Sequence, residues 1–431
     1  MRGTSVLGRP ALFATACGLL AATLLPTAAS AAPTIRAQSW YLKAMNVEAA
    51  QKVVTGKGVT VAVIDTGVNP DIPALSGQVL PGYDPGGGDG RSDRAGHGTS
   101  MAALIAGKGG SPDTLLGVAP GAKILPVMLS PTEDHMAAPH GVIEQLVHWS
   151  IDHGAKVVSM SFSVPDATPP DDPWKRELVK YATDHGAVLV ASAGNRADGG
   201  SDIGRPGDIP GVVTVTGLGR DGKGWSGSVT GQNAAIAAPA EQITFPTGLS
   251  DRPTETASGT SGSAALVAGE LALIMSRYPG ISPGDAINRL IGSAHDLGAK
   301  GRDPVYGYGS ADASAALTKD VPKAGGNPLL ATSGPTAAEA DSSSFALSTV
   351  VLVALVAAVL LLVVVLIVVV VVRRRGGPKG PNGGGGGGGP GGPPPYGPRP
   401  GPAGYRQPPK WQQAPPRQPE RSPAGAPPVR R

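Results

Sequence analysis

Two kinds of hydrophobic pattern alternate through the middle of the chain. Short apolar runs are typical of strands buried on both faces of a sheet, and they lie at 59–64, 156–160, 187–191 and 212–216. Longer segments with apolar residues three and four positions apart predict helices, and they lie at 142–151, 174–183 and 264–278. This alternation predicts an α/β domain of about 280 residues with a mostly parallel sheet.

Two other apolar segments have the pattern of targeting and membrane elements. Residues 1–31 combine early arginines, an apolar run and a small-residue cleavage pattern, which together predict a secretory signal peptide. Residues 345–372 carry no charge, and as a helix they would measure roughly 42 Å, enough to cross a bilayer core of about 30 Å. Three arginines follow directly at 373–375, which predicts a cytoplasmic C-terminus and a globular part outside the cell.

The segments around the predicted span have the composition of linkers and tails. Residues 321–344 are rich in Gly, Ser, Thr and Ala, and we expect a flexible stalk. Residues 373–431 are basic and rich in Pro and Gly, and we expect a disordered cytoplasmic tail. The globular domain, with a short N-terminal extension, is then 32–320.

Charge and cysteine content exclude several classes of function. The formal charge is +4, but 11 of the 36 Lys and Arg residues lie in 373–431, so the globular part is acidic. Nucleic acid is therefore not an expected partner. The one cysteine, Cys17, lies in the predicted signal peptide, which excludes disulfides, cysteine zinc sites and cysteine nucleophiles from the rest of the chain.

Four polar residues lie next to predicted strand ends or helix starts. In proteins with a parallel sheet, catalytic and binding residues lie at the carboxyl ends of the strands. Asp65 follows the run 59–64, and His97 lies in a Gly-His-Gly turn that opens another apolar stretch. Asn195 follows the run 187–191, and Ser261 precedes the long apolar helix. A serine hydroxyl needs a base, and the base needs an orienting carboxylate, so these residue types together predict nucleophilic catalysis.

The sequence around these residues resembles the subtilisin-like serine proteases. The matching blocks run in the order Asp, His, Asn, Ser, over roughly residues 40–317, and read Val-Ile-Asp-Thr-Gly, Gly-His-Gly-Thr, Ala-Gly-Asn and Gly-Thr-Ser. The resemblance implies a subtilisin-like three-layer fold and a serine endopeptidase that acts on proteins or peptides. In it Ser261 would be the nucleophile, His97 the base and Asp65 its orienting carboxylate, with Asn195 in the oxyanion hole.

The resemblance also implies a substrate pocket, a subgroup and a location. Two segments are similar to the walls of the primary pocket, and their residues are Ser161, Phe162, Ser163, Ala193 and Gly194. The layout is similar to the mycosins, which are membrane-anchored subtilases that accompany type VII secretion systems. The expected location is the cell membrane, with a single span in contact with lipid, and a secretion complex is an expected partner.

The chain departs from the family pattern at two places. The family usually follows its Gly-Thr-Ser with one residue, two alanines and a proline, whereas here the nucleophile is followed by Gly262, Ser263, Ala264 and Ala265. Only about 28 residues separate the predicted signal peptide from the first strand, too few for an independently folded inhibitory domain. The resemblance then implies an N-terminal extension that packs around the domain and is not a removable inhibitor. No cofactor and no metal ligand set is expected, and a structural calcium ion, which some subtilases bind, has no identifiable site in the sequence.

An alternative interpretation remains open at this point. A subtilase fold could serve as a weakly active or inactive scaffold that stabilises a membrane secretion complex. The altered residues after Ser261 are compatible with it, whereas the four intact residues Asp65, His97, Asn195 and Ser261 favour an active enzyme.

Overall fold

Six parallel strands form the main sheet of the structure, a computed structural model that describes residues 33–132, 138–165, 168–169 and 171–330. Their order across the sheet is β2-β1-β3-β4-β5-β6, so the chain runs outward in both directions from β1. The strands are β1 (Thr60–Asp65), β2 (Lys123–Met128), β3 (Val157–Met160), β4 (Val188–Ser192), β5 (Val213–Leu218) and β6 (Ala234–Pro239). Almost every strand residue is buried, as a sheet covered on both faces requires.

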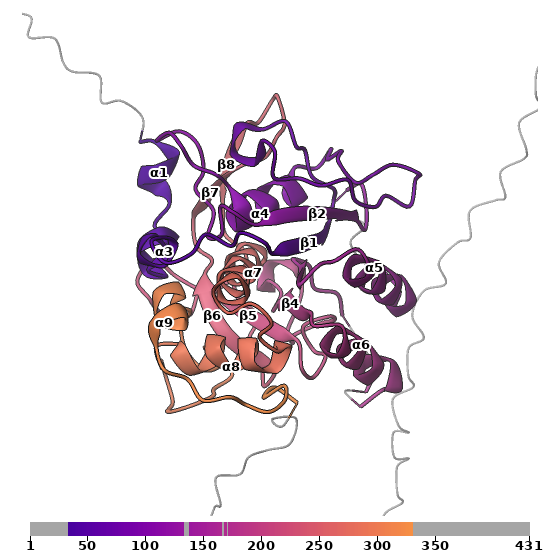
Figure 1. Cartoon of the computed structure of the whole chain (residues 1–431), viewed down its shortest axis with the longest axis vertical. Coiled ribbons are helices and arrows are strands. Elements are labelled where there is room, and N and C mark those ends of the chain that lie inside the picture. Colours follow the sequence, from indigo (N-terminus) through magenta and orange to yellow (C-terminus); the bar gives the residue numbers. More distant parts are fainter. Residues whose placement is uncertain (1–32, 133–137, 166–167, 170, 331–431) are drawn as a thin grey trace, which may run out of the picture. The chain divides into compact units, whose positions relative to one another are not determined.

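Helices cover both faces of this sheet, and successive side chains of each strand point to opposite faces. Val61 and Val63 of β1 pack into the core that holds α4 (His97–Ala106) and α7 (Thr260–Arg277). Ala62 and Ile64 pack into the core on the other face, under α5 (His140–Asp152) and α6 (Pro173–Asp184). Figure 1 shows α5 and α6 side by side, away from the central α7. The fold therefore has the predicted three layers with a parallel sheet.

The N-terminal extension packs against the domain, as the resemblance implies. It forms three short helices, α1 (Ile35–Gln38), α2 (Tyr41–Ala44) and α3 (Val47–Gln51). Tyr41 is fully buried and its hydroxyl donates to Leu116 O at 2.5 Å. The indole of Trp40 donates to Glu241 O at 2.9 Å. The extension thus contributes to the hydrophobic core.

Smaller elements complete the described part of the chain. The helices α8 (Pro283–Ser293) and α9 (Ala313–Thr318) pack on α7. A separate antiparallel hairpin is formed by β7 (Ile243–Pro246) and β8 (Thr254–Ala257). Two 3₁₀ turns are η1 (Pro73–Leu75) and η3 (Arg196–Asp198).

The targeting and membrane predictions concern other parts of the chain. The predicted signal peptide 1–31, the predicted span 345–372 and the tail 373–431 lie outside the described residues, as does most of the predicted stalk. Within the described ranges, no helix is long and apolar enough to cross a membrane. The predicted boundaries and topology stay predictions.

Candidate active site

The four residues singled out in the sequence lie at one edge of the sheet. Asp65 ends β1, His97 begins α4, Asn195 follows β4, and Ser261 is the second residue of α7. His97, Asn195 and Ser261 all line a cleft of about 750 Å³. Segments that are nearly 200 residues apart in sequence therefore meet where the carboxyl ends of parallel strands place them.

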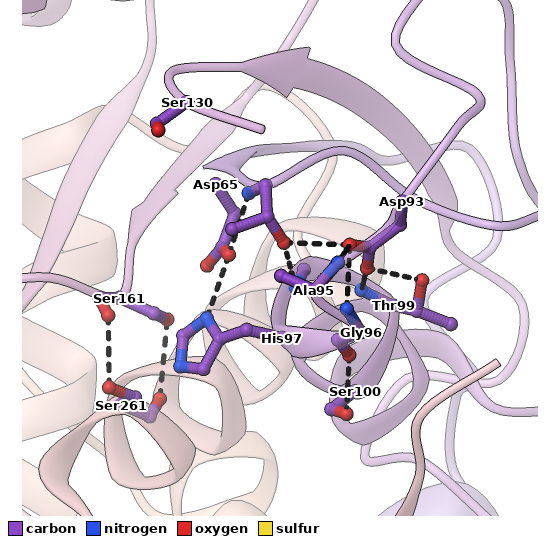
Figure 2. A network of polar contacts seen from close by, with 12 residues as sticks. Asp65, Asp93, Ala95, Gly96, His97, Thr99, Ser100, Ser130, Ser161 and Ser261 are labelled. Carbon is purple, nitrogen blue, oxygen red and sulfur yellow. Dashed lines mark hydrogen bonds and ion pairs between the residues drawn. The ribbon is translucent and has the colours of Figure 1, made fainter. Parts of the chain in front are cut away.

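Asp65 and His97 are joined by a direct hydrogen bond. His97 Nδ1 lies 2.7 Å from Asp65 Oδ1 (Figure 2). The carboxylate is fully buried, whereas the imidazole side chain is 20% exposed on the cleft side. Asp65 Oδ1 also accepts from Thr66 N at 2.8 Å, and Oδ2 has no partner among the described residues. The bond fixes the ring through Nδ1 and leaves Nε2 as the nitrogen that can exchange a proton.

A second buried carboxylate, Asp93, organises the loop that delivers His97, and the sequence analysis did not identify it. Its two oxygens accept five hydrogen bonds, from Thr66 Oγ1, Ala95 N, Gly96 N, Thr99 N and Thr99 Oγ1, at 2.6–3.1 Å (Figure 2). The Thr66 hydroxyl in turn accepts from Gly98 N at 3.0 Å. Asp93 thus connects the residue after Asp65 with the residues on both sides of His97.

Gly98 shows why a glycine must follow His97. A Cβ atom at this position would lie 2.1 Å from the carbonyl oxygen of Gly67. The first turn of α4 therefore packs against the backbone after β1 more closely than any side chain permits. This close approach brings His97 within hydrogen-bond distance of Asp65.

The hydroxyl of Ser261 is directed at the neighbouring strand end. Ser261 Oγ donates to Ser161 O at 2.9 Å, and Ser161 Oγ donates back to Ser261 O at 3.2 Å (Figure 2). Ser261 lines the cleft from the first turn of α7, a helix of 18 residues, where backbone N–H groups have no acceptor within the helix and the helix dipole has its positive end. Such an end stabilises negative charge that develops on a bound substrate.

The amide side chain of Asn195 is fixed through both of its ends. Its Oδ1 accepts from Thr260 N at 3.0 Å and from Thr260 Oγ1 at 3.1 Å. Its Nδ2 donates to Asp198 Oδ2 at 3.0 Å. Thr260 Oγ1 also accepts from Gly194 N at 3.1 Å, which ties the loop after β4 to the start of α7. Neither Thr260 nor Asp198 was identified from the sequence.

Four of the five predicted pocket residues line the cleft. They are Ser161, Phe162, Ser163 and Gly194. Ala193 differs, because its side chain is fully buried and its neighbours Ser192 and Gly194 face the cleft instead. The alternation of side chains along a strand end explains the difference.

The two unusual residues after the nucleophile have separate structural roles. Gly262 lines the cleft, and a Cβ there would make only ordinary contacts, 3.7 Å from Leu104 and 4.0 Å from Ile243. Ser263 is fully buried, and its hydroxyl contacts the carbonyl oxygens of Ala238 and Pro239 at 3.1 and 3.0 Å. Ser263 therefore binds α7 to the end of β6 without reaching the cleft.

No metal site accompanies these residues in the described part of the chain. No group of three or more His, Cys, Asp or Glu side chains is arranged there to hold an ion. The chemistry of the cleft is that of a carboxylate, an imidazole, a hydroxyl and amide donors.

Comparisons with known proteins identify what this arrangement is similar to. The model of the subtilase family matches residues 56–309. Mycosin-3 of Mycobacterium tuberculosis is 32% identical in an alignment of 336 positions that covers 64% of this chain and 71% of that protein. Mycosin-1 of Mycolicibacterium smegmatis is 31% identical, covering 68% and 76%. The solved structure of "a serine protease MycP1, an essential component of the type VII (ESX-1) secretion system" matches with a TM-score of 0.57 at 30% identity, over 66% of this chain and 89% of that chain.

Proposed function

The chain belongs to the subtilase family of serine proteases and is similar to the mycosins, and from this premise we propose that it is an active endopeptidase with Asp65, His97 and Ser261 as its catalytic residues. The observation that carries the proposal is the 2.7 Å bond between His97 Nδ1 and the buried Asp65 carboxylate, beside a serine at a helix start in the same cleft. A base oriented by a buried carboxylate is what a serine nucleophile requires.

The proposed reaction proceeds through an acyl-enzyme. The Ser261 hydroxyl turns from Ser161 O to His97 Nε2, which takes the proton as Oγ attacks the peptide carbonyl. Asp65 holds the ring in the required tautomer and stabilises the imidazolium. The backbone N–H of Ser261 and an N–H of Asn195 bind the oxyanion, His97 protonates the leaving amine, and water then hydrolyses the ester by the reverse transfer.

The cleft is lined after β3 by Ser161, Phe162 and Ser163, and at the end of β4 by Ser192 and Gly194. Because they carry small side chains and one phenylalanine, we propose an open primary pocket that tolerates apolar residues. Such a pocket suits a protein or peptide substrate in extended conformation.

Hydrolysis of denatured casein tests the proposal. Ser261→Ala should lower turnover on the order of 10⁶-fold while the protein stays folded, because the attacking oxygen is lost. Ser263→Ala is the matched control, since it removes a hydroxyl two residues along the same helix that does not reach the cleft, and it should keep turnover within about tenfold. If Ser261→Ala retained a tenth of the wild-type rate, Ser261 would not be the nucleophile.

The alternative function as a structural scaffold makes the opposite prediction. A folded wild-type protein without hydrolytic activity, and with the same thermal stability as Ser261→Ala, would favour the scaffold. The close hydrogen bonding around His97 and Asn195 favours the enzyme, because a scaffold has no need for an oriented imidazole beside a solvent cleft.

We propose further that the protease domain is held outside the cell by the predicted span 345–372 and acts on proteins near a type VII secretion system. The relatives supply the second part of this proposal, since one of them is described as an essential component of such a system. External protease on intact cells should release a fragment ending near residue 340, while a tag after Arg431 stays protected until lysis. A C-terminal tag cleaved on intact cells would contradict this topology.

A further inference from the structure

Asn195 and Asp198 are connected by two hydrogen bonds across one short turn. The backbone N–H of Asp198 donates to Asn195 O at 3.2 Å, and Asn195 Nδ2 donates to Asp198 Oδ2 at 3.0 Å. Asp198 ends η3 and is followed by Gly199 in the left-handed region, with φ of 83°. The turn therefore folds the carboxylate back onto the amide of Asn195.

This contact completes the fixation of the amide. A side-chain amide rotates about its last bond, and its two ends exchange roles in a half turn. Thr260 holds the oxygen end through two donors, and Asp198 accepts one N–H of the nitrogen end. An amide nitrogen has two N–H groups, so one remains for a ligand in the cleft.

We propose that Asp198 is a positioning residue for the oxyanion hole, acting through Asn195. This inference rests on the proposed function, because it assigns a cause to the orientation of one of its donors. Preorganised donors stabilise a transition state without reorganisation during the reaction, so an amide held from both ends is more effective than one held from one. Asp198 itself need not touch the substrate.

Nearby charged groups do not replace Asp198 in this position. The Arg196 guanidinium contacts Thr230 Oγ1 at 3.5 Å, and as a donor it cannot accept an amide N–H. Asp202 also lines the cleft and is exposed like Asp198, but its carboxylate accepts from Ser201 Oγ at 2.8 Å. Asp202 is therefore a matched control: a carboxylate in the same loop and cleft, with a different hydrogen-bond partner.

The test uses turnover of fluorescein-labelled casein by the full-length protein. Asp198→Ala should lower kcat by about 3–10-fold with KM within twofold, the loss expected for one hydrogen bond to the amide. Asp198→Leu, which keeps the volume without an acceptor, should behave in the same way. Asp198→Asn, which keeps an acceptor oxygen, should restore kcat to within about twofold of wild type, and Asp202→Ala should lower kcat less than Asp198→Ala does.

A double-mutant cycle separates positioning from other effects. If Asp198 acts through Asn195, the loss caused by Asp198→Ala should disappear in an Asn195→Ala background. An equal loss in both backgrounds, an effect on KM alone, or an equal loss in Asp202→Ala would overturn the proposal. Failure of the proposed function is distinguishable, because it would appear as an inactive wild type or as an unaffected Ser261→Ala protein.

Discussion

The two sides of the catalytic cleft are built in different ways. One side, here called the His97 side, is a buried network whose members are Asp65, Thr66, Asp93, His97 and Thr99. The other, the Ser261 side, is more open, and its members are Ser161, Asn195, Asp198, Thr260 and Ser261. On the His97 side two carboxylates, at most 9% exposed, accept from four backbone N–H groups and three side-chain groups of the described residues. On the Ser261 side an exposed carboxylate accepts from a single side-chain amide.

The difference indicates that the His97 side must be rigid, whereas the Ser261 side must allow side chains to change their contacts. Backbone donors fix the His97 loop as part of the fold, so its catalytic geometry and its stability are coupled. The Ser261 side must accept a substrate and let a hydroxyl change partners, so its contacts are fewer and reach solvent. Substitutions on the first side should therefore change stability, whereas those on the second should change kcat.

Asp93→Ala should have the largest effect on stability. It leaves the buried Thr66 hydroxyl and the Gly96 and Thr99 N–H groups without their acceptor, each worth about 1–3 kcal/mol. We expect a loss of about 3–5 kcal/mol in the free energy of unfolding, measured by urea titration. Asp89→Ala, which removes an exposed carboxylate paired with Arg91, should stay within about 0.5 kcal/mol. Equal effects of the two substitutions would contradict the coupling of loop and stability.

Asn195→Ala, on the Ser261 side, should lower kcat strongly and change stability little. Removing one oxyanion donor is expected to lower kcat by about 10²–10³-fold, which corresponds to about 2.7–4 kcal/mol of transition-state stabilisation. The unfolding free energy should change by less than the Asp93 substitution changes it, because Asn195 is partly exposed. An effect confined to KM would show that Asn195 binds the substrate and does not stabilise the transition state.

Glu270 contrasts with Asp93, because it is a buried carboxylate without the hydrogen-bond donors that surround Asp93. It lies in the middle of α7 and is 0% exposed, and neither of its oxygens has a hydrogen-bond partner among the described residues. Burial, with a smaller contribution from the charge of Asp312, raises the pKa of Glu270 well above its ordinary value. The neutral carboxyl is therefore favoured in the folded protein.

The smallest effect is expected from Glu270→Leu, and it should stabilise the protein. Replacing an unpaired buried carboxyl with an apolar side chain of similar volume should add about 1–3 kcal/mol at neutral pH, with turnover unchanged. The raised pKa predicts that wild-type stability is highest relative to the variant below the unfolded-state pKa, about 4.3, and falls as pH rises toward the folded-state value. Urea titrations of both proteins between pH 4 and 8 measure this difference. A difference that is constant with pH would mean that Glu270 does not titrate abnormally.

The elements with strong hydrophobic patterns were predictable from the sequence. The runs at 59–64, 156–160, 187–191 and 212–216 became β1, β3, β4 and β5 to within a few residues, and the long apolar segment 264–278 became most of α7. Two strands of the same sheet were missed. β2 is interrupted by Pro126 at a sheet edge, although it contains Ile124 and Val127, and β6 has a single β-branched residue, Ile236, among alanines. Both strands therefore have a weaker strand pattern than the four that were predicted.

The candidate site was predictable only in part, because only some of its residues stand in recognisable sequence motifs. Asp65, His97, Asn195 and Ser261 stand in motifs whose spacing identifies them. Thr260 contacts Asn195, 65 positions away, and the two become neighbours only in the folded chain. Asp93 and Asp198 accept from groups only three residues away, as the aspartates of ordinary turns also do. An aspartate in a glycine-rich loop has no local pattern that separates an organising role from an ordinary turn.

The number of fluorophosphonate groups bound per chain tests most directly whether the cleft is an active serine protease site. We predict one adduct per folded chain by intact-mass spectrometry, located by digestion on the peptide that contains Ser261. Ser261→Ala should carry none, and Asn195→Ala should be labelled more slowly at the same residue. A folded wild-type protein that forms no adduct, or one labelled at another residue, would contradict the assignment of Ser261, His97 and Asp65 as the catalytic residues.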